Sequence, residues 1–120
     1  MNKHTAAVLC AIEGAVATAR IKHPGAYASP HQAYALALEE LDEYWDEVRA
    51  KKRNHSLMLH ELIDLAAVCV RAATEVHLAK MPEYEILDAL ALRQLGLPVY
   101  DLLLRIRRDH TPFDPGERTL

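Results

Sequence analysis

The sequence predicts an all-α protein, a helical bundle of about four to five helices. Ala and Leu are abundant, aromatic residues make up only 6% of the chain, and its 120 residues include only 4 Gly. Ala and Leu favour helices, whereas strands are rich in β-branched and aromatic residues. Apolar positions also recur at helical spacing in long segments separated by turn residues. We expect a single domain over residues 1–109 and an extended or disordered tail over residues 110–120.

Charge and hydropathy narrow the class of protein. A net charge of −3 argues against a nucleic-acid-binding protein. No stretch reaches the roughly twenty uncharged residues of a membrane span, and Glu13 ends the first apolar run too early for a signal peptide. We therefore expect a cytoplasmic protein. Cys10 and Cys69 lie far apart in apolar helical settings, which favours two buried thiols over a disulfide or a zinc site.

Two helices are expected in the first half of the chain. The first covers residues 5–22 and ends at a Pro-Gly pair. The second covers residues 30–52, where Ser29 suits the N-cap, Pro30 the first helical position and Gln32 a capping box. Its i, i+4, i+7 spacing predicts a core-facing apolar stripe. The stripe consists of Tyr34, Leu38, Leu41, Trp45 and Val48.

A third helix, over residues 57–76, is the element around which we expect the others to pack. Apolar residues fall on every side of it, which predicts burial all round. It nevertheless carries Glu61 and Asp64, and buried carboxylates are costly unless something pairs with them. Arg71 is about two turns from Asp64, too far for a simple pair. A metal ion is the natural candidate for the missing charge.

The second helix carries an acidic block that can complete such a site. A solvated acidic face is the simpler interpretation of this helix alone. A short connection, however, makes the second and third helices antiparallel neighbours. Glu40 and Glu43 lie about as far before the turn as Glu61 and Asp64 lie after it, so the two pairs should come level. Four carboxylates would offer hard oxygen ligands, which suit Mg²⁺ or Mn²⁺.

Other metals and other ligands fit the sequence less well. A di-iron bundle needs Glu-x-x-His pairs, and His60, adjacent to Glu61, is expected to point elsewhere. Two more helices are expected over residues 83–95 and 98–109, and together they resemble a helix-turn-helix. From residue 81 onward, however, five basic residues stand against seven acidic ones, a poor balance for binding DNA.

The acidic residues also resemble a known family signature. Glu39-Glu40-Leu41-Asp42-Glu43, seventeen residues and then Glu61-Leu62-Ile63-Asp64 resemble the EExxE…ExxD motif of the MazG-like all-α nucleoside triphosphate pyrophosphohydrolases. The resemblance covers about residues 30–76. It implies a MazG-like architecture and Mg²⁺-dependent hydrolysis of a (deoxy)nucleoside triphosphate to the monophosphate and pyrophosphate. It also implies a homodimer or homotetramer, with the nucleotide held partly by neighbouring subunits.

Carried over by position, the resemblance assigns roles to five acidic residues. Four of them would be metal ligands: Glu40, Glu43, Glu61 and Asp64. Glu39 would support the site or help position the attacking water. On the nucleotide side, Arg71 is in line with the carboxylates and is a candidate for contacting a phosphate, although a salt bridge to Glu75 at i+4 fits as well. Weaker basic candidates are Lys51, Lys52, Arg53 and Lys80. Speculative contacts to the nucleotide are Tyr34, Trp45 and His31.

A second hypothesis is a non-catalytic helical interaction protein that retains the carboxylate metal site. The sparse supply of basic residues for a triphosphate motivates it. Release of pyrophosphate from a panel of nucleotides would separate the two hypotheses.

Overall fold

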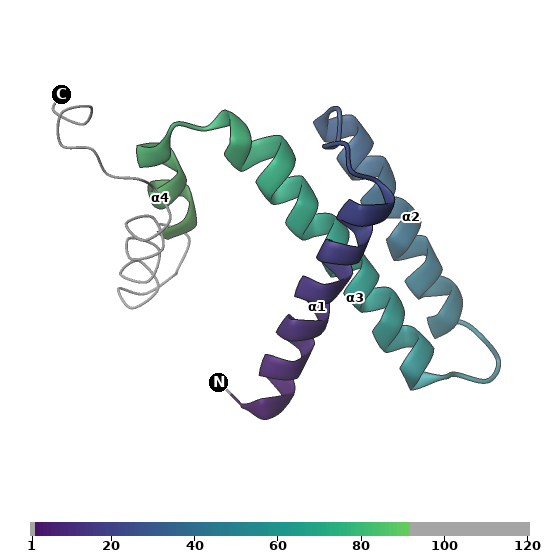
Figure 1. Ribbon diagram of the computed structural model, residues 1–120. Helices are drawn as coiled ribbons and strands as arrows, with labels where there is room; N and C mark the ends of the chain where they lie inside the picture. The colour runs from purple at the N-terminus through teal and green to yellow at the C-terminus, as the bar shows by residue number, and fades with distance from the viewer. Residues whose placement is uncertain (1, 92–120) are drawn as a thin grey trace, which may run out of the picture. The chain divides into compact units, whose positions relative to one another are not determined.

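The structure, a computed structural model, describes residues 2–91 of the chain (Figure 1). The chain separates into two compact units, Met1–Lys80 and Met81–Leu120. Every element in residues 2–91 is helical, with no strand among them, so the predicted all-α class is confirmed. The expected helix over residues 98–109 and the expected tail over 110–120 lie outside the described residues. The single domain expected over residues 1–109 stays a prediction.

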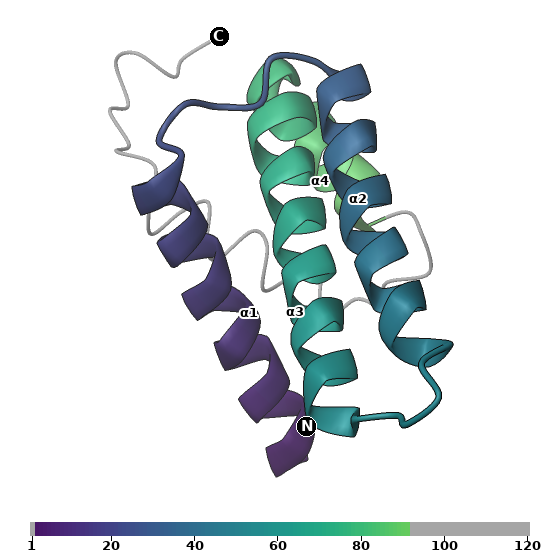
Figure 2. The same ribbon diagram turned by 90° about the vertical axis from the view of Figure 1, so that its right-hand side faces the viewer.

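Three long helices make up the first unit: α1 (Lys3–Lys22), α2 (Pro30–Val48) and α3 (His55–Arg71). Helix α3 continues through a π-helical turn, Ala72–His77, and a 3₁₀ turn, Leu78–Lys80. It packs against both α1 and α2 and lies between them, with α2 antiparallel to it (Figure 2). The acidic segments of α2 and α3 are therefore neighbours in space.

The second unit contains α4 (Glu83–Ala91), which begins directly after Pro82. The carbonyl of Pro82 accepts hydrogen bonds from the backbone N–H groups of Glu85 and Ile86, at 3.0 and 3.1 Å. This matches the start of the helix expected over residues 83–95. Across residues 2–91, no helix combines the length and apolar character that crossing a bilayer requires.

Side-chain caps set the helix boundaries. The N–H of Gln32 donates to Ser29 Oγ at 3.1 Å, as expected, while Gln32 Oε1 accepts from the N–H of Ala28 rather than from Ser29. Helix α3 begins two residues earlier than predicted because Asn54 Oδ1 accepts from two backbone N–H groups at 2.9 and 3.2 Å. Helix α2 ends at Val48, four residues before the predicted end at residue 52. Arg53 Nε donates a hydrogen bond to the carbonyl oxygen of Val48 at 2.9 Å and so caps the end of the helix.

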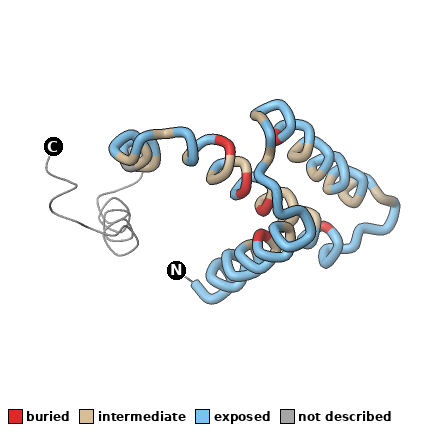
Figure 3. The backbone as a smooth tube through the Cα atoms, turned by 45° about the horizontal axis from the view of Figure 1, so that its top comes forward, coloured by how far each residue is buried: buried red, intermediate tan, exposed pale blue. Residues whose placement is uncertain are grey.

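Four of the five residues of the predicted apolar stripe of α2 are exposed and Val48 is half-buried, so the expectation that the stripe faces the core was wrong (Figure 3). Tyr34 and Trp45 are 70% and 55% exposed, and Leu38 and Leu41 are exposed as well. A neighbouring face of α2 is buried or half-buried instead: Ala33, Leu36, Ala37, Glu40, Tyr44 and Glu47. Small Ala side chains let α2 approach α3 closely, and this contact turns Glu40 inward.

Helix α3 is not buried all round, and the predicted burial of the two cysteines was also wrong. Among the described elements, α3 has helical neighbours only along the faces toward α1 and α2, which leaves the remaining face open. Cys10 and Cys69 are both free and exposed. The exposed apolar residues of α3 are Leu57, Leu59, Leu62 and Val70, and the buried apolar residues of the described chain are Val16, Ala33, Met58, Ala67 and Val76.

Arg71 ties the α1–α2 connection to the end of α3. Its side chain is only 2% exposed and forms a two-pronged ion pair with Glu75, at 2.7 and 3.0 Å. The same guanidinium donates to the carbonyl oxygens of His23 and Gly25, and it lies 4.6 Å above the ring of Tyr27. The hydrogen bonds that Glu75 accepts from Arg71, with a smaller contribution from Arg20, hold the pKa of its carboxyl below the usual value, against the opposing effect of burial. The predicted Arg71–Glu75 pair is confirmed.

We predict that Arg71→Met lowers the free energy of unfolding by about 3 kcal/mol, because it leaves Glu75 and two carbonyl oxygens without their main donor. Arg49→Met is the matched control. Its pair with Asp46 is as short, 2.7 Å, but both side chains are about 60% exposed (62% and 59%), so the loss should be under about 0.5 kcal/mol. Urea unfolding followed by circular dichroism measures both. Equal losses would contradict a structural role for Arg71.

Candidate functional site

The carboxylates of α2 and α3 meet across the contact between the two helices. Glu40, Glu43 and Glu61 each place one carboxylate oxygen within 4.8 Å of the others. Asp64 stands outside this group of atoms, but its charge still raises the pKa values of Glu40 and Glu61. The antiparallel pairing therefore brings the two acidic segments level, as their spacing in the sequence predicted.

Burial and mutual repulsion make this cluster costly in the absence of a cation. Burial is the largest cause that raises the pKa of Glu40 to about 7, followed by the charges of Glu43 and Asp64. Burial, again the largest cause, and the neighbouring Glu43 raise the pKa of Glu61 too. One oxygen of Glu40 and one of Glu61 are inaccessible to solvent and have no hydrogen-bond partner among the described residues. An unpaired buried oxygen of this kind is what a bound cation would satisfy.

His60 partners Asp64, contrary to the expectation that it points away from the site. Its Nε2 lies 3.4 Å from Asp64 Oδ2. The sequence argument considered only the adjacent Glu61, but residues four apart share a helix face. His60 thus lies beside Asp64, next to the carboxylate cluster, where it can form an ion pair when it is protonated.

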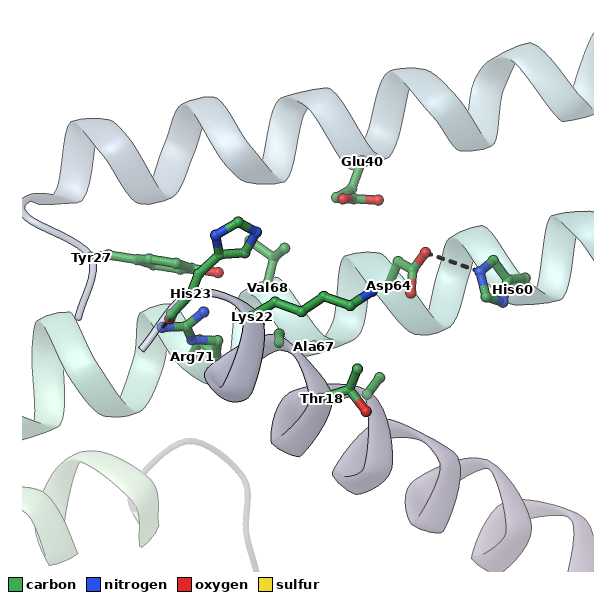
Figure 4. A pocket seen from close by; sticks show the side chains of 12 residues that line it. Thr18, Lys22, His23, Tyr27, Glu40, His60, Asp64, Ala67, Val68 and Arg71 are labelled. Atoms are coloured by element: carbon green, nitrogen blue, oxygen red, sulfur yellow. Dashed lines mark hydrogen bonds and ion pairs between the residues drawn. The ribbon is translucent and has the colours of Figure 1, made fainter. Parts of the chain in front are cut away.

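An open pocket of about 430 Å³ lies beside the cluster, where α1, α2 and α3 come together. Figure 4 shows Glu40, Asp64 and His60 at one end of it and Tyr27, His23 and Arg71 at the other. The side chain of Lys22 reaches between these ends and points its amino group toward Asp64 (Figure 4).

The other predicted site residues have different surroundings. Glu39 is exposed on α2 and does not belong to the cluster. Arg71 lines the pocket, whereas Lys52 lies in the connection between α2 and α3 and is not part of the pocket wall. The three residues considered for contacts to the nucleotide, Tyr34, Trp45 and His31, are exposed on α2.

The pocket residues that sequence reasoning missed include Lys22, His23 and Tyr27. They come from the last position of α1 and the connection that follows. No spacing within one helix could reveal them, because they reach the site through the way α1 packs on α3. The sequence offered one hint, namely that Arg71 lies on a largely apolar helix and needs partners there. In the structure it donates to the carbonyl oxygens of His23 and Gly25 and so holds this connection in place.

Comparisons with protein families, with curated proteins and with solved structures find no match to this chain.

The site combines a cluster of carboxylate oxygens with an adjacent pocket. The pocket is lined by acidic residues, Glu40 and Asp64, and by basic ones, Lys22 and Arg71. Carboxylates often gather on helical surfaces without an ion. Here, however, Glu40 and Glu61 each keep an inaccessible, unpaired oxygen, and the exposed Glu43 stands between them. These donors fit a hard divalent cation such as Mg²⁺ or Mn²⁺.

We predict that the metal-free protein loses stability as the pH rises from 5.5 to 7.5. The pKa of Glu40 is raised from 4.5 to about 7 by folding. Between these values the folded state keeps a proton that the unfolded state has lost, so this contribution to stability falls as the pH rises through the window. The loss should be roughly 1–2 kcal/mol for this partly exposed group.

Glu40→Gln should remove most of this loss and stabilise the metal-free protein at pH 7.5, while Glu39→Gln, its exposed neighbour, should behave like the wild type. Thermal unfolding in EDTA at the two pH values measures the difference. The two variants each replace one carboxyl of the same segment, so the comparison among the three proteins isolates Glu40. A wild-type slope that Glu40→Gln leaves unchanged would contradict the cluster.

Proposed function

We propose that this protein is a Mg²⁺-dependent nucleoside triphosphate pyrophosphohydrolase, which cleaves a (deoxy)nucleoside triphosphate to the monophosphate and pyrophosphate. One observation carries the proposal. Of the four residues that the EExxE…ExxD resemblance nominates as metal ligands, Glu40, Glu43 and Glu61 each place one carboxylate oxygen within 4.8 Å of the others, across α2 and α3. If the acidic residues of α2 were only a solvated face, nothing would require them to meet the acidic residues of α3 at the positions that the motif specifies.

The proposed ligands of Mg²⁺ are Glu40, Glu43, Glu61 and Asp64, and Mn²⁺ would suit the same oxygens. When bound, such an ion neutralises charge that develops on the phosphate chain and acidifies a water molecule. The chain's own residues contribute positioning. His60 orients Asp64 through the 3.4 Å contact, and the adjacent pocket gives a nucleotide access to the cluster. By the resemblance, Glu39 would help to place the attacking water, although it is exposed and lies outside the cluster.

The same proposal includes a homodimer or homotetramer working in the cytoplasm. The apolar stripe of α2 is exposed, and so are several apolar residues of α3. Contiguous exposed apolar surface on a small protein marks an interaction site. Self-association would cover this surface, and it agrees with the family resemblance, in which neighbouring subunits help to hold the nucleotide.

The alternative, a non-catalytic helical interaction protein, also draws support from the exposed stripe. It differs from the enzyme in one measurable way, since it would bind a divalent cation without releasing pyrophosphate.

We predict that the wild-type protein releases pyrophosphate from at least one member of a nucleoside triphosphate panel in the presence of Mg²⁺, and that EDTA stops the reaction. Glu40→Gln and Asp64→Asn should each lower kcat/KM by at least about a hundredfold, because each removes a metal ligand. Coupled detection of pyrophosphate measures the rates.

Asp42→Asn is the matched control, since Asp42 belongs to the same acidic block but not to the cluster. Circular dichroism should show the same helix content in all variants. Absence of turnover with every nucleotide, despite metal binding, would favour the interaction protein.

We also predict that Leu41→Lys weakens self-association at least about tenfold, because it places a charge within the apolar stripe. Asp42→Lys introduces the same side chain at the next position of α2, outside the stripe, and should have little effect. Sedimentation velocity over a range of protein concentrations measures both. A wild type that sediments as a monomer at every concentration would rule out the homo-oligomer.

A further inference from the structure

The proposed substrate carries several negative charges, and the pocket must supply cations to meet them. Arg71 is the basic residue that the sequence favoured. In the structure its Nε and Nη2 atoms make four hydrogen bonds, two to Glu75 and two to backbone carbonyl oxygens. Three of the five N–H groups of this guanidinium thus hold the fold, and Arg71 lies at the end of the pocket away from Asp64 (Figure 4). The pocket therefore needs another cation near the carboxylates.

Lys22 is placed to meet this need. It is the last residue of α1 and lies in the pocket wall together with Glu40 and Asp64. Its amino group points toward Asp64 (Figure 4), yet Lys22 makes no ion pair within the described part of the chain. Asp64 is partnered by His60 instead, at 3.4 Å. Lys22 is thus an exposed cation in the pocket wall, on the side opposite α2, without an ion pair in the described part of the chain.

We propose that Lys22 binds the phosphate chain of the substrate, on the opposite side of that chain from the carboxylate cluster. The inference rests on the proposed function, which supplies the polyphosphate. A lysine ammonium is a compact charge with three donors on a flexible stem, so it can follow phosphate oxygens without a fixed geometry. A polyphosphate between Lys22 and a cation held by the carboxylates would have positive charge on both sides, in a protein whose net charge is −3.

This placement also orients the rest of the nucleotide. With the phosphates between Lys22 and the carboxylates, the remaining pocket lies toward Tyr27 and His23 (Figure 4). The Tyr27 ring is fixed by the Arg71 guanidinium, 4.6 Å from the ring centroid. The sugar and base therefore extend toward the α1–α2 connection, and neither Trp45 nor Tyr34 is among the residues that line the pocket.

A competing role for Lys22 is that of a simple counter-ion to the acidic cluster. The two roles predict different results. A counter-ion competes with the metal, so its removal strengthens Mg²⁺ binding. A phosphate ligand leaves the Mg²⁺ dependence unchanged and weakens binding of the phosphate chain.

The test uses the full chain with three substitutions: Lys22→Gln, Lys22→Arg and Lys3→Gln. Lys3 is the matched control, because it lies on the same helix at the opposite end. Calorimetry measures binding of inorganic pyrophosphate in the presence of Mg²⁺, and steady-state assays measure kcat, KM and the Mg²⁺ midpoint. Thermal unfolding checks that the variants remain folded.

We expect Lys22→Gln to weaken pyrophosphate binding and to raise KM, each about tenfold, with an unchanged Mg²⁺ midpoint. Lys22→Arg should restore most of the affinity, and Lys3→Gln should match the wild type. Unchanged pyrophosphate affinity in Lys22→Gln, or a shifted Mg²⁺ midpoint, would overturn the inference.

Failure of the proposed function has a separate signature. A wild type that binds pyrophosphate through Lys22 but hydrolyses no nucleotide would refute the enzyme and leave the anion site standing. A wild type that binds no pyrophosphate at all would refute the role of Lys22 directly.

Discussion

The buried ion pair between Arg71 and Glu75 is the interaction on which the geometry of the pocket depends. One guanidinium joins three parts of the chain: the end of α3, the π-helical turn after it, and the α1–α2 connection. Arg20, near the end of α1, adds a second contact to Glu75 at 3.3 Å. Since a buried charge without partners is unfavourable, any rearrangement that separates Arg71 from these partners would be costly. Lys22 and Tyr27 owe their places in the pocket to it.

The contact between α2 and α3 works by a different principle. Small side chains such as Ala33 and Ala37 bring the helices close, and this approach carries Glu40 and Glu61 into partly buried positions. The raised pKa values of both carboxyls record the cost, for which burial is the largest cause. Repulsion among these carboxylates does not stabilise the fold. The cluster therefore makes physical sense as a place for a ligand.

The sequence predicted the parts of this protein that depend on local pattern. Helix class, the Ser29 cap, the antiparallel α2 and α3, and the meeting of Glu40 with Glu61 all follow from spacing along one helix or across one short turn. The MazG-like architecture and the activity remain proposals.

Periodicity could not decide which of two candidate faces of α2 is buried. The larger apolar side chains favoured the face that contains Trp45, but this face is exposed. The buried face is the one that carries Ala33 and Ala37, because small side chains let the two helices pack closely. Lys22 and Tyr27 were missed because tertiary packing, and not sequence spacing, brings them to the site.

The thin interior has a consequence of its own. In the described chain only five apolar residues are buried, the largest of them Met58, and no large side chain is fully enclosed. A small domain with so modest an interior keeps little free energy in reserve. If copies of the chain cover one another's exposed leucines and tryptophan, folding and assembly become one equilibrium, and dilution alone loosens the fold. The amount of protein in its surroundings would then govern how much of it is in working form.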